Sequence, residues 1–258
     1  MTSPSRAETV RQSWRRLVTF VPELRQPGLV ALVGALIVLG TVAALVVGSR
    51  APRRAPYAAV LVQGALGLWA AGWFAGFWRQ RAAYRQRYGA DAYRFLFFRF
   101  LLPGLVGGLA VLWLPLFVGG TPLLPPAVAY GAAAYLLLSA TLLERRGPEI
   151  YWSWDIRAFV YSVFPERGPV LTSGVFRWLR HPVYSAFVRT VLGFALLRNN
   201  LPALLCAALL VPGIWLLGRT EERDLMQSHP GYGAYRARVP PWFSTRPIRF
   251  WRFLLTGR

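Results

Sequence analysis

The twenty residues Leu29–Gly48, LVALVGALIVLGTVAALVVG, contain no charged side chain and decide the class of fold. An α-helix rises about 1.5 Å per residue, so a helix of this length spans the roughly 30 Å hydrocarbon core of a bilayer. Three more uncharged runs follow it, at Tyr57–Phe77, Phe100–Gly119 and Leu123–Leu143. A soluble protein would have to bury four helices that are apolar on every face, so these runs predict membrane spans.

Two apolar segments near the C-terminus complete the prediction. Val183–Leu197 is interrupted by Arg189, whereas Leu201–Gly218 carries no charge, and Arg198-Asn199-Asn200 between them predicts a tight turn. We therefore expect an all-α fold, a polytopic transmembrane helical bundle of about six spans. The last two spans form a helical hairpin, and a cytoplasmic C-terminal helix follows. The composition agrees, because only 16% of the residues are charged, against about 25% in soluble domains.

Glycine and proline residues modify the third span. Gly104, Gly107 and Gly108 would permit close approach of a neighbouring helix. Pro103 and Pro115 predict local bends in the same span.

The placement of the arginines predicts the orientation in the membrane. All 30 basic residues are arginine, and they gather before the first span, between the second and third, and after the fourth. The positive-inside rule then places both termini in the cytoplasm of a multi-pass protein of the cytoplasmic (inner) membrane, with Arg50, Arg53 and Arg54 as outward-facing exceptions. Because the arginines lie between apolar spans, we attribute the net charge of +20 to membrane topology and exclude a nucleic-acid partner.

The chain divides into three regions. Residues 1–26 form a basic interfacial lead, residues 27–143 a four-span membrane bundle, and residues 144–258 the final hairpin with a cytoplasmic tail. The aromatic stretch 144–173 is either an interfacial segment or a lid over a site. The tail from Trp242 to Arg252 mixes aromatic and basic residues and is expected to lie on anionic lipid headgroups. The first span is too long for a signal peptide and is interpreted as a retained anchor.

Two polar segments flank the final hairpin, at Arg177–Tyr184 and Arg219–Leu225. If the hairpin turns at Asn199-Asn200, residue x of one helix lies opposite approximately 399 − x of the other. His181 and Glu222 should therefore meet at the cytoplasmic mouth of the bundle, and Pro182 suits the first turn of the helix between them. Two interpretations remain open, namely structural ion pairs of Glu221 and Glu222 with Arg177, Arg180 and Arg219, or a binding site.

Three motifs in this region favour a binding site. Arg180, His181, Pro182 and Tyr184 form Arg-His-Pro-x-Tyr, and Glu221-Glu222 follows after one hairpin. Tyr232, Tyr235, Arg236, Val239 and Pro240 form Tyr-x-x-Tyr-Arg-x-x-Val-Pro. Together they resemble the isoprenylcysteine carboxyl methyltransferase family and its relatives, which include phospholipid N-methyltransferases and bacterial thiol S-methyltransferases. The resemblance covers roughly residues 165–245. Departures at residues 174–176 and 228–229 are expected to tune packing or substrate fit.

The resemblance implies methyl transfer from S-adenosylmethionine, at the cytoplasmic membrane face, to a lipid-soluble acceptor or a small thiol, carboxyl or amine. Donors on arginine and histidine suit the methionyl carboxylate, carboxylates suit the amino group or ribose, and aromatic faces suit the sulfonium. The implied cofactor residues are Arg180, His181, Pro182, Tyr184, Glu221, Glu222 and Tyr235. Tyr232 and Arg236 are assigned to the substrate. No metal is expected, because Cys206, His181 and His229 do not make a closed zinc site.

Arg189 lies seven residues beyond Pro182, about 10 Å deeper along the helix. An arginine at such a depth faces the bundle interior or a wet cavity. It either pairs with a polar group or receives an anionic part of the substrate.

Two other functions remain open. Membrane sterol reductases, which use a nicotinamide cofactor, resemble this family in their C-terminal region. A non-catalytic membrane scaffold is the third reading. The bilayer and a lipophilic or small-molecule acceptor are the partners expected for the methyltransferase.

Overall fold

The computed structural model describes residues 14–15, 17–50, 57–146 and 172–257. Within these ranges every regular element is a helix. The long helices are α2 (Pro27–Arg50), α3 (Ala58–Tyr88), α7 (Pro126–Arg146), α9 (Pro182–Arg198) and α10 (Leu201–Ser228). The short ones are η1 (Pro22–Arg25), η3 (Gly89–Asp91), α4 (Ala92–Leu96), η4 (Phe97–Leu101), α5 (Leu102–Leu105), α6 (Ala110–Phe117), η5 (Gly174–Arg177), α11 (Tyr232–Arg238) and α12 (Pro247–Thr256).

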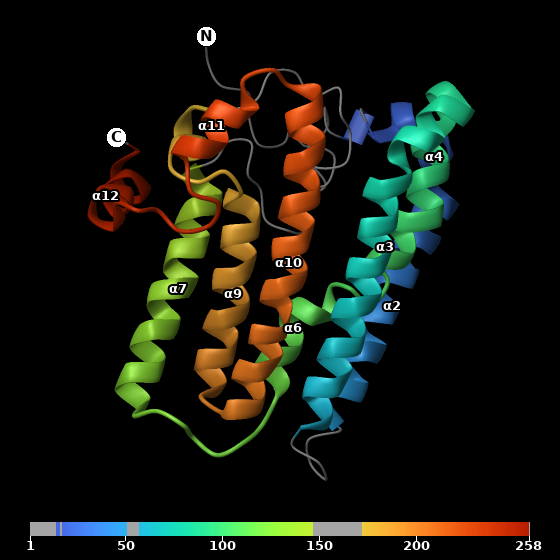
Figure 1. Ribbon diagram of the computed structural model, residues 1–258. Coiled ribbons are helices and arrows are strands. Elements are labelled where there is room, and N and C mark those ends of the chain that lie inside the picture. Colours follow the sequence, from blue (N-terminus) through green and yellow to red (C-terminus); the bar gives the residue numbers. More distant parts are fainter. Residues whose placement is uncertain (1–13, 16, 51–56, 147–171, 258) are drawn as a thin grey trace.

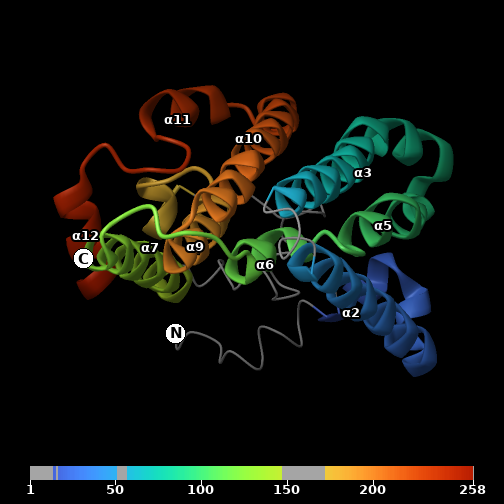
Figure 2. The same ribbon diagram turned by 90° about the horizontal axis from the view of Figure 1, so that it is seen from below.

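The long helices form two groups (Figure 1). Helices α7, α9 and α10 lie side by side in one group, and α2 lies beside α3 in the other. The short helix α6 lies between the groups and packs against α9, α10 and α2, as the view in Figure 2 shows. Helix α10 also packs along α3, so the two groups form one bundle. The C-terminal helices α11 and α12 lie at the end of the bundle where α9 begins (Figure 1).

The described part contains four helical stretches long and apolar enough to cross a bilayer. They are Pro27–Arg50, Ala58–Phe117, Pro126–Arg146 and Leu201–Gln227. Large apolar side chains project outward from them, for example Leu39, Leu61 and Leu68, which are 65–78% exposed. Apolar surface of this extent is stable against lipid rather than water. The prediction of an all-α transmembrane bundle is confirmed, while the count of six spans and the side on which α12 lies stay predictions.

The third predicted span is not one continuous helix. After α4, the π-helical η4 and α5, the chain turns at residues 106–109 before α6 begins. Gly107 has a φ of +77°, which residues with a side chain rarely adopt, and a Cβ at Gly108 would lie 2.2 Å from the Gly104 carbonyl oxygen. Within Phe100–Gly119 the chain is therefore interrupted at the glycines and not only bent at the prolines, as predicted, because the same glycines that allow close packing also allow the chain to turn.

A buried glutamine of α3 stabilises the short helix that follows this turn. Pro115 has no N–H, so the carbonyl of Val111 lacks its usual partner four residues ahead. Gln63 Nε2 donates to this carbonyl at 2.9 Å and to the Cys206 carbonyl at 3.2 Å. Gln63 is 1% exposed, and its two hydrogen bonds join α3, α6 and α10 in the middle of the bundle.

The predicted hairpin between α9 and α10 is confirmed. Asn199 ends α9 in the left-handed conformation with φ of +49°, and Asn200 caps α10 by accepting the N–H of Ala203 at 2.9 Å. The side chain of Asn199 also accepts from the Leu124 N–H and donates to the Leu124 carbonyl. These hydrogen bonds therefore fix the segment that connects α6 to α7 against the turn between α9 and α10.

Two regions predicted from the sequence are described only in part. Most of the aromatic stretch 144–173, with its predicted role as an interfacial segment or lid, lies outside the described residues, as do the first thirteen residues of the lead. In the described part of the lead, Leu17, Val21 and Leu24 are buried in a cluster with Phe77 and Tyr93.

Candidate functional site

The start of α9 and the last part of α10 lie opposite each other, in the register that the hairpin predicts. Pro182 is the first residue of α9, and His181 precedes it as the N-cap. A Cβ placed on Gly218 would lie 3.6 Å from His181 Nε2 and 3.7 Å from the Tyr184 ring. Glu222 follows Gly218 by one helical turn on the same face of α10, which brings its carboxylate to His181.

Glu222 is the centre of a buried ionic cluster. Its Oε1 lies 2.9 Å from His181 Nε2 and 3.2 Å from Arg180 Nη1, and its Oε2 lies 2.9 Å from Arg236 Nε. The residue is 3% exposed, and a carboxylate at that depth requires such charge-assisted partners. The predicted meeting of His181 and Glu222 is confirmed.

His181 faces a carboxylate with each of its ring nitrogens. Nδ1 lies 3.6 Å from Glu221 Oε2, opposite the closer contact of Nε2 with Glu222. The ring also stacks on Tyr184, with centroids 5.3 Å apart and 23° between the planes. Three residues of the first two motifs, Tyr184, Glu221 and Glu222, therefore surround the imidazole of His181.

Two arginines proposed as partners of the carboxylates lie on aromatic rings instead. The guanidinium of Arg177 is 5.3 Å from the Trp178 ring centroid, and that of Arg219 is 4.7 Å from the Trp215 centroid. Arg177 belongs to η5, before α9 begins, so the helical register that pairs residue 181 with 218 does not extend to it. Of the three arginines named for structural ion pairs, Arg180 alone contacts Glu222 within the described part of the chain.

Helix α11 closes the cluster with the residues of the third motif. Tyr232 and Tyr235 are buried, and the Tyr235 hydroxyl donates to the Phe176 carbonyl at 2.8 Å. Burial raises the pKa of the Tyr232 phenol, and the negative charges of Glu222 and Glu221 raise it further, so this phenol is neutral. Tyr232 and Arg236, assigned to the substrate, thus lie with the residues assigned to the cofactor, and both assignments stay predictions.

The segment after α11 fixes the backbone of the first motif. The N–H of Arg180 donates to the Pro240 carbonyl at 2.9 Å, and the N–H of His181 donates to the Pro241 carbonyl at 3.0 Å. The Ser185 hydroxyl donates to the Trp242 carbonyl one turn into α9. The motif Val239-Pro240 was visible in the sequence, but its contact with Arg180 depends on tertiary packing.

Arg189 lies apart from this cluster and is 3% exposed. Its Nε donates to Ser185 Oγ at 3.1 Å and its Nη1 to Ser139 Oγ at 2.9 Å. The guanidinium also lies 4.8 Å from the Phe243 ring centroid and 6.0 Å from that of Phe250. Arg189 therefore faces the bundle interior, as predicted, and its partners include two serines that sequence reasoning missed. Its role toward a substrate stays a prediction.

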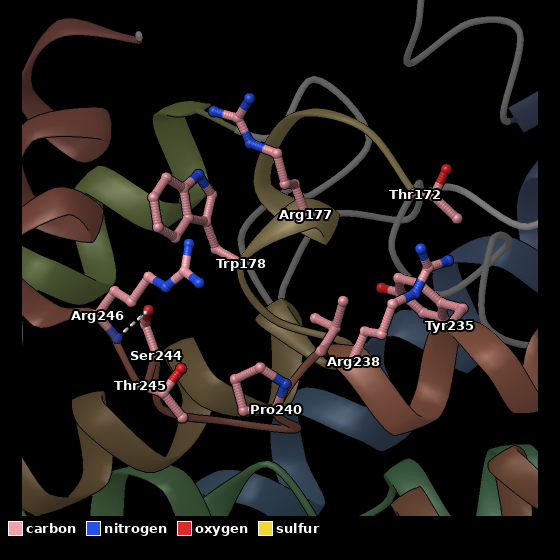
Figure 3. A pocket seen from close by; sticks show the side chains of 10 residues that line it. Thr172, Arg177, Trp178, Tyr235, Arg238, Pro240, Ser244, Thr245 and Arg246 are labelled. Carbon is pink, nitrogen blue, oxygen red and sulfur yellow. Dashed lines mark hydrogen bonds between the residues drawn. The ribbon is translucent and has the colours of Figure 1, made fainter.

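An open pocket of about 680 Å³ adjoins the cluster at Tyr235 (Figure 3). The residues that line it are Thr172, Arg177, Trp178, Tyr235, Arg238, Val239, Pro240, Ser244, Thr245 and Arg246. Two buried donors of this region, Trp178 Nε1 and Arg180 Nε, have no hydrogen-bond partner within the described structure. Unpartnered buried donors are costly, so both suit an anionic group of a ligand.

Comparison with known proteins identifies the region that contains the site. Residues 128–233 match the family model of phospholipid methyltransferases. The matched residues include α9, α10 and the Arg180–His181–Glu222 cluster. No curated protein and no solved structure matches the chain. The family match confirms the resemblance for the first two motifs and ends at residue 233, within the third.

Proposed function

We propose, on the premise that residues 128–233 belong to the phospholipid methyltransferase family, that the chain transfers methyl groups from S-adenosylmethionine at the cytoplasmic face of the membrane. The family supports methyl transfer by an integral membrane protein, and the cofactor, the acceptor and the likeness to isoprenylcysteine carboxyl methyltransferases are our inference. The acceptor is a lipid-soluble molecule or a small thiol, carboxyl or amine. The observation that carries the proposal is the Glu222 cluster, in which Arg180, His181 and Arg236 meet one buried carboxylate.

An unpartnered donor beside Glu222 matches the anionic end of S-adenosylmethionine. Arg180 Nε is buried and offers an N–H group to the methionyl carboxylate. Glu222 uses both of its oxygens on protein donors, so it acts as a positioning residue for Arg180 and His181.

The cationic and hydroxyl groups of the cofactor match the remaining residues. Glu221, 9% exposed, would accept from the amino group or the ribose hydroxyls. The rings of Tyr184, Tyr232 and Tyr235 would lie near the sulfonium, where aromatic faces attract cations. All three rings belong to elements that meet at the cluster.

The reaction requires positioning more than acid–base chemistry. The bound cofactor supplies a methyl group on a positively charged sulfur. A bond forms between the methyl carbon and the acceptor atom while the carbon–sulfur bond breaks, and its electron pair stays on sulfur. A thiolate or carboxylate acceptor needs no base, whereas a neutral amine would lose a proton. The protein contributes mainly by holding the two reactants in line, which can account for several orders of magnitude in rate.

A transfer assay tests this function. The purified chain, reconstituted in liposomes, would be incubated with S-adenosylmethionine tritiated in the methyl group and with fractionated membrane extracts. We expect tritium to appear in an extract component, and Arg180→Ala to abolish the transfer. Arg219→Gln is the control, because Arg219 lies on Trp215 outside the cluster. The proposal fails if no fraction is labelled while the chain oxidises NADPH, which would favour the reductase, or while it binds neither cofactor, which would favour a scaffold.

A further inference from the structure

The pocket beside the cluster is basic. Arg177, Arg238 and Arg246 belong to its lining, and none of the ten described residues that line it is acidic. Figure 3 shows the Arg246 side chain extending toward Trp178, beside Ser244 and Thr245. Three guanidinium groups therefore border one hollow, together with the hydroxyls of Thr172, Tyr235, Ser244 and Thr245.

The charges of these arginines are not compensated within the part of the chain that the structure describes. Arg177 lies on the Trp178 and Phe253 rings, and Arg238 Nε donates to the Ala234 carbonyl. No carboxylate among the described residues forms an ion pair with any of the three. Because Trp178 Nε1 is also buried without a partner, the pocket has both the charge and the donors to bind an anion.

Apolar surface continues from the basic pocket along the start of α12. A second, mostly apolar groove is lined by Arg246, Pro247, Ile248 and Arg249, so the two hollows share Arg246. Ile248 is 86% exposed, and Phe243, next to Ser244 of the pocket, is 49% exposed. Contact with this apolar surface does not strengthen the binding of a free anion. It strengthens the binding of an amphiphile, because the hydrocarbon chain is removed from water.

Helix α12 has the three faces expected of a helix at a membrane interface. Phe250, Phe253 and Leu254 are buried against the bundle. Ile248 and Leu255, seven residues apart, form an exposed apolar face, and the exposed Arg249 and Arg252 lie on a third face. One face therefore contacts protein, one suits lipid chains, and one suits anionic headgroups.

We propose that the basic pocket binds the phosphate-bearing headgroup of an anionic membrane lipid, whose chains lie against Ile248 and Phe243. The headgroup phosphate would contact Arg246, Arg238 and the donors of Trp178 and Thr245. This site does not depend on methyl transfer, because its three arginines lie outside the ionic cluster around Glu222.

Short-chain lipids test the site without a bilayer. The full chain, purified in a neutral detergent, would be titrated with dioctanoylphosphatidylglycerol, dioctanoylphosphatidylcholine and inorganic phosphate, with binding followed by native mass spectrometry. We expect saturable binding of phosphatidylglycerol and at least tenfold weaker binding of the other two. Each arginine near an anionic lipid contributes about fivefold in affinity, so Arg238→Gln with Arg246→Gln should weaken binding by about 25-fold.

Arg219→Gln is the matched control, since Arg219 is exposed on α10 and lines neither hollow. Equal losses in the control and in the double variant would overturn the proposal, and so would equal binding of phosphatidylcholine. Binding of inorganic phosphate as tight as that of phosphatidylglycerol would show an anion site without lipid recognition. Displacement of the lipid by S-adenosylmethionine would assign the pocket to the cofactor. A thermal melt of each variant confirms that it is folded.

Discussion

Replacing Glu222 by glutamine removes one negative charge from the centre of the ionic cluster and leaves its volume unchanged. The carboxylate accepts from His181 and Arg180 through Oε1 and from Arg236 through Oε2. A glutamine keeps one acceptor oxygen and turns an N–H₂ group toward donors that need an acceptor. The variant therefore leaves three donors competing for one oxygen in a buried place.

The structure sets the size of the effect. Removing one partner of a buried ion pair costs about 3–5 kcal/mol. Arg236 is 31% exposed and can turn to water, so we expect the lower end, about 3 kcal/mol. For a chain of this size that loss lowers the Tm by about 6–12 °C. The Kd for S-adenosylmethionine should rise at least tenfold, because Arg180 and His181 are no longer held in place. Differential scanning fluorimetry and calorimetry in detergent measure the two quantities.

Glu23→Gln is the control for the same chemical change elsewhere. Glu23 pairs with Arg94, which is 44% exposed, and such pairs contribute about 0–1 kcal/mol. The control should keep its Tm within about 4 °C of the wild type and bind the cofactor unchanged. A Glu222→Gln protein with wild-type Tm would refute the account of the cluster. A lowered Tm with an unchanged Kd would leave the cluster structural and refute its role in binding the cofactor.

Three further substitutions test other parts of the account. Arg189→Leu should raise the KM for the acceptor and leave the Kd of S-adenosylmethionine unchanged; an unaltered KM would exclude Arg189 from the substrate site. The pKa of the Tyr232 phenol is higher in the folded chain than in the unfolded chain. As the pH rises past 10, the unfolded chain therefore loses this proton first, and the free energy of unfolding decreases. Thermal melts between pH 9 and 11 should therefore show a smaller loss of Tm for Tyr232→Phe than for the wild type. Gln63→Leu leaves the Val111 carbonyl without its donor and should cost about 1–3 kcal/mol, seen as a lower Tm with an unchanged cofactor Kd.

Much of the site followed from the sequence because it depends on one local element. A hairpin whose turn lies at Asn199-Asn200 fixes which residues of α9 and α10 face each other, so the contact of His181 with Glu222 could be predicted by counting. The membrane spans could also be predicted from the sequence. A run without charged residues reflects the lipid around the helix and does not depend on a contact with one particular distant residue.

The rest depends on contacts between distant segments. The carbonyls of Pro240 and Pro241 reach Arg180 and His181 across sixty residues, and no sequence pattern signals that contact. Ser139, which accepts from Arg189, lies on α7, fifty residues away, and nothing in its sequence surroundings signals that contact. The break between α5 and α6 had a visible signal in the glycines at 104, 107 and 108. We interpreted it as close packing because helix propensity alone does not separate a packing glycine from a turning one.

The central claim, that the Glu222 cluster binds S-adenosylmethionine, is tested most directly by isothermal titration calorimetry. The purified chain would be titrated with S-adenosylmethionine and, separately, with NADPH, alongside the Arg180→Ala and Arg219→Gln variants. The account predicts saturable binding of S-adenosylmethionine alone, lost in Arg180→Ala and kept in Arg219→Gln. Binding of NADPH in place of S-adenosylmethionine, or equal binding of S-adenosylmethionine by both variants, would contradict it.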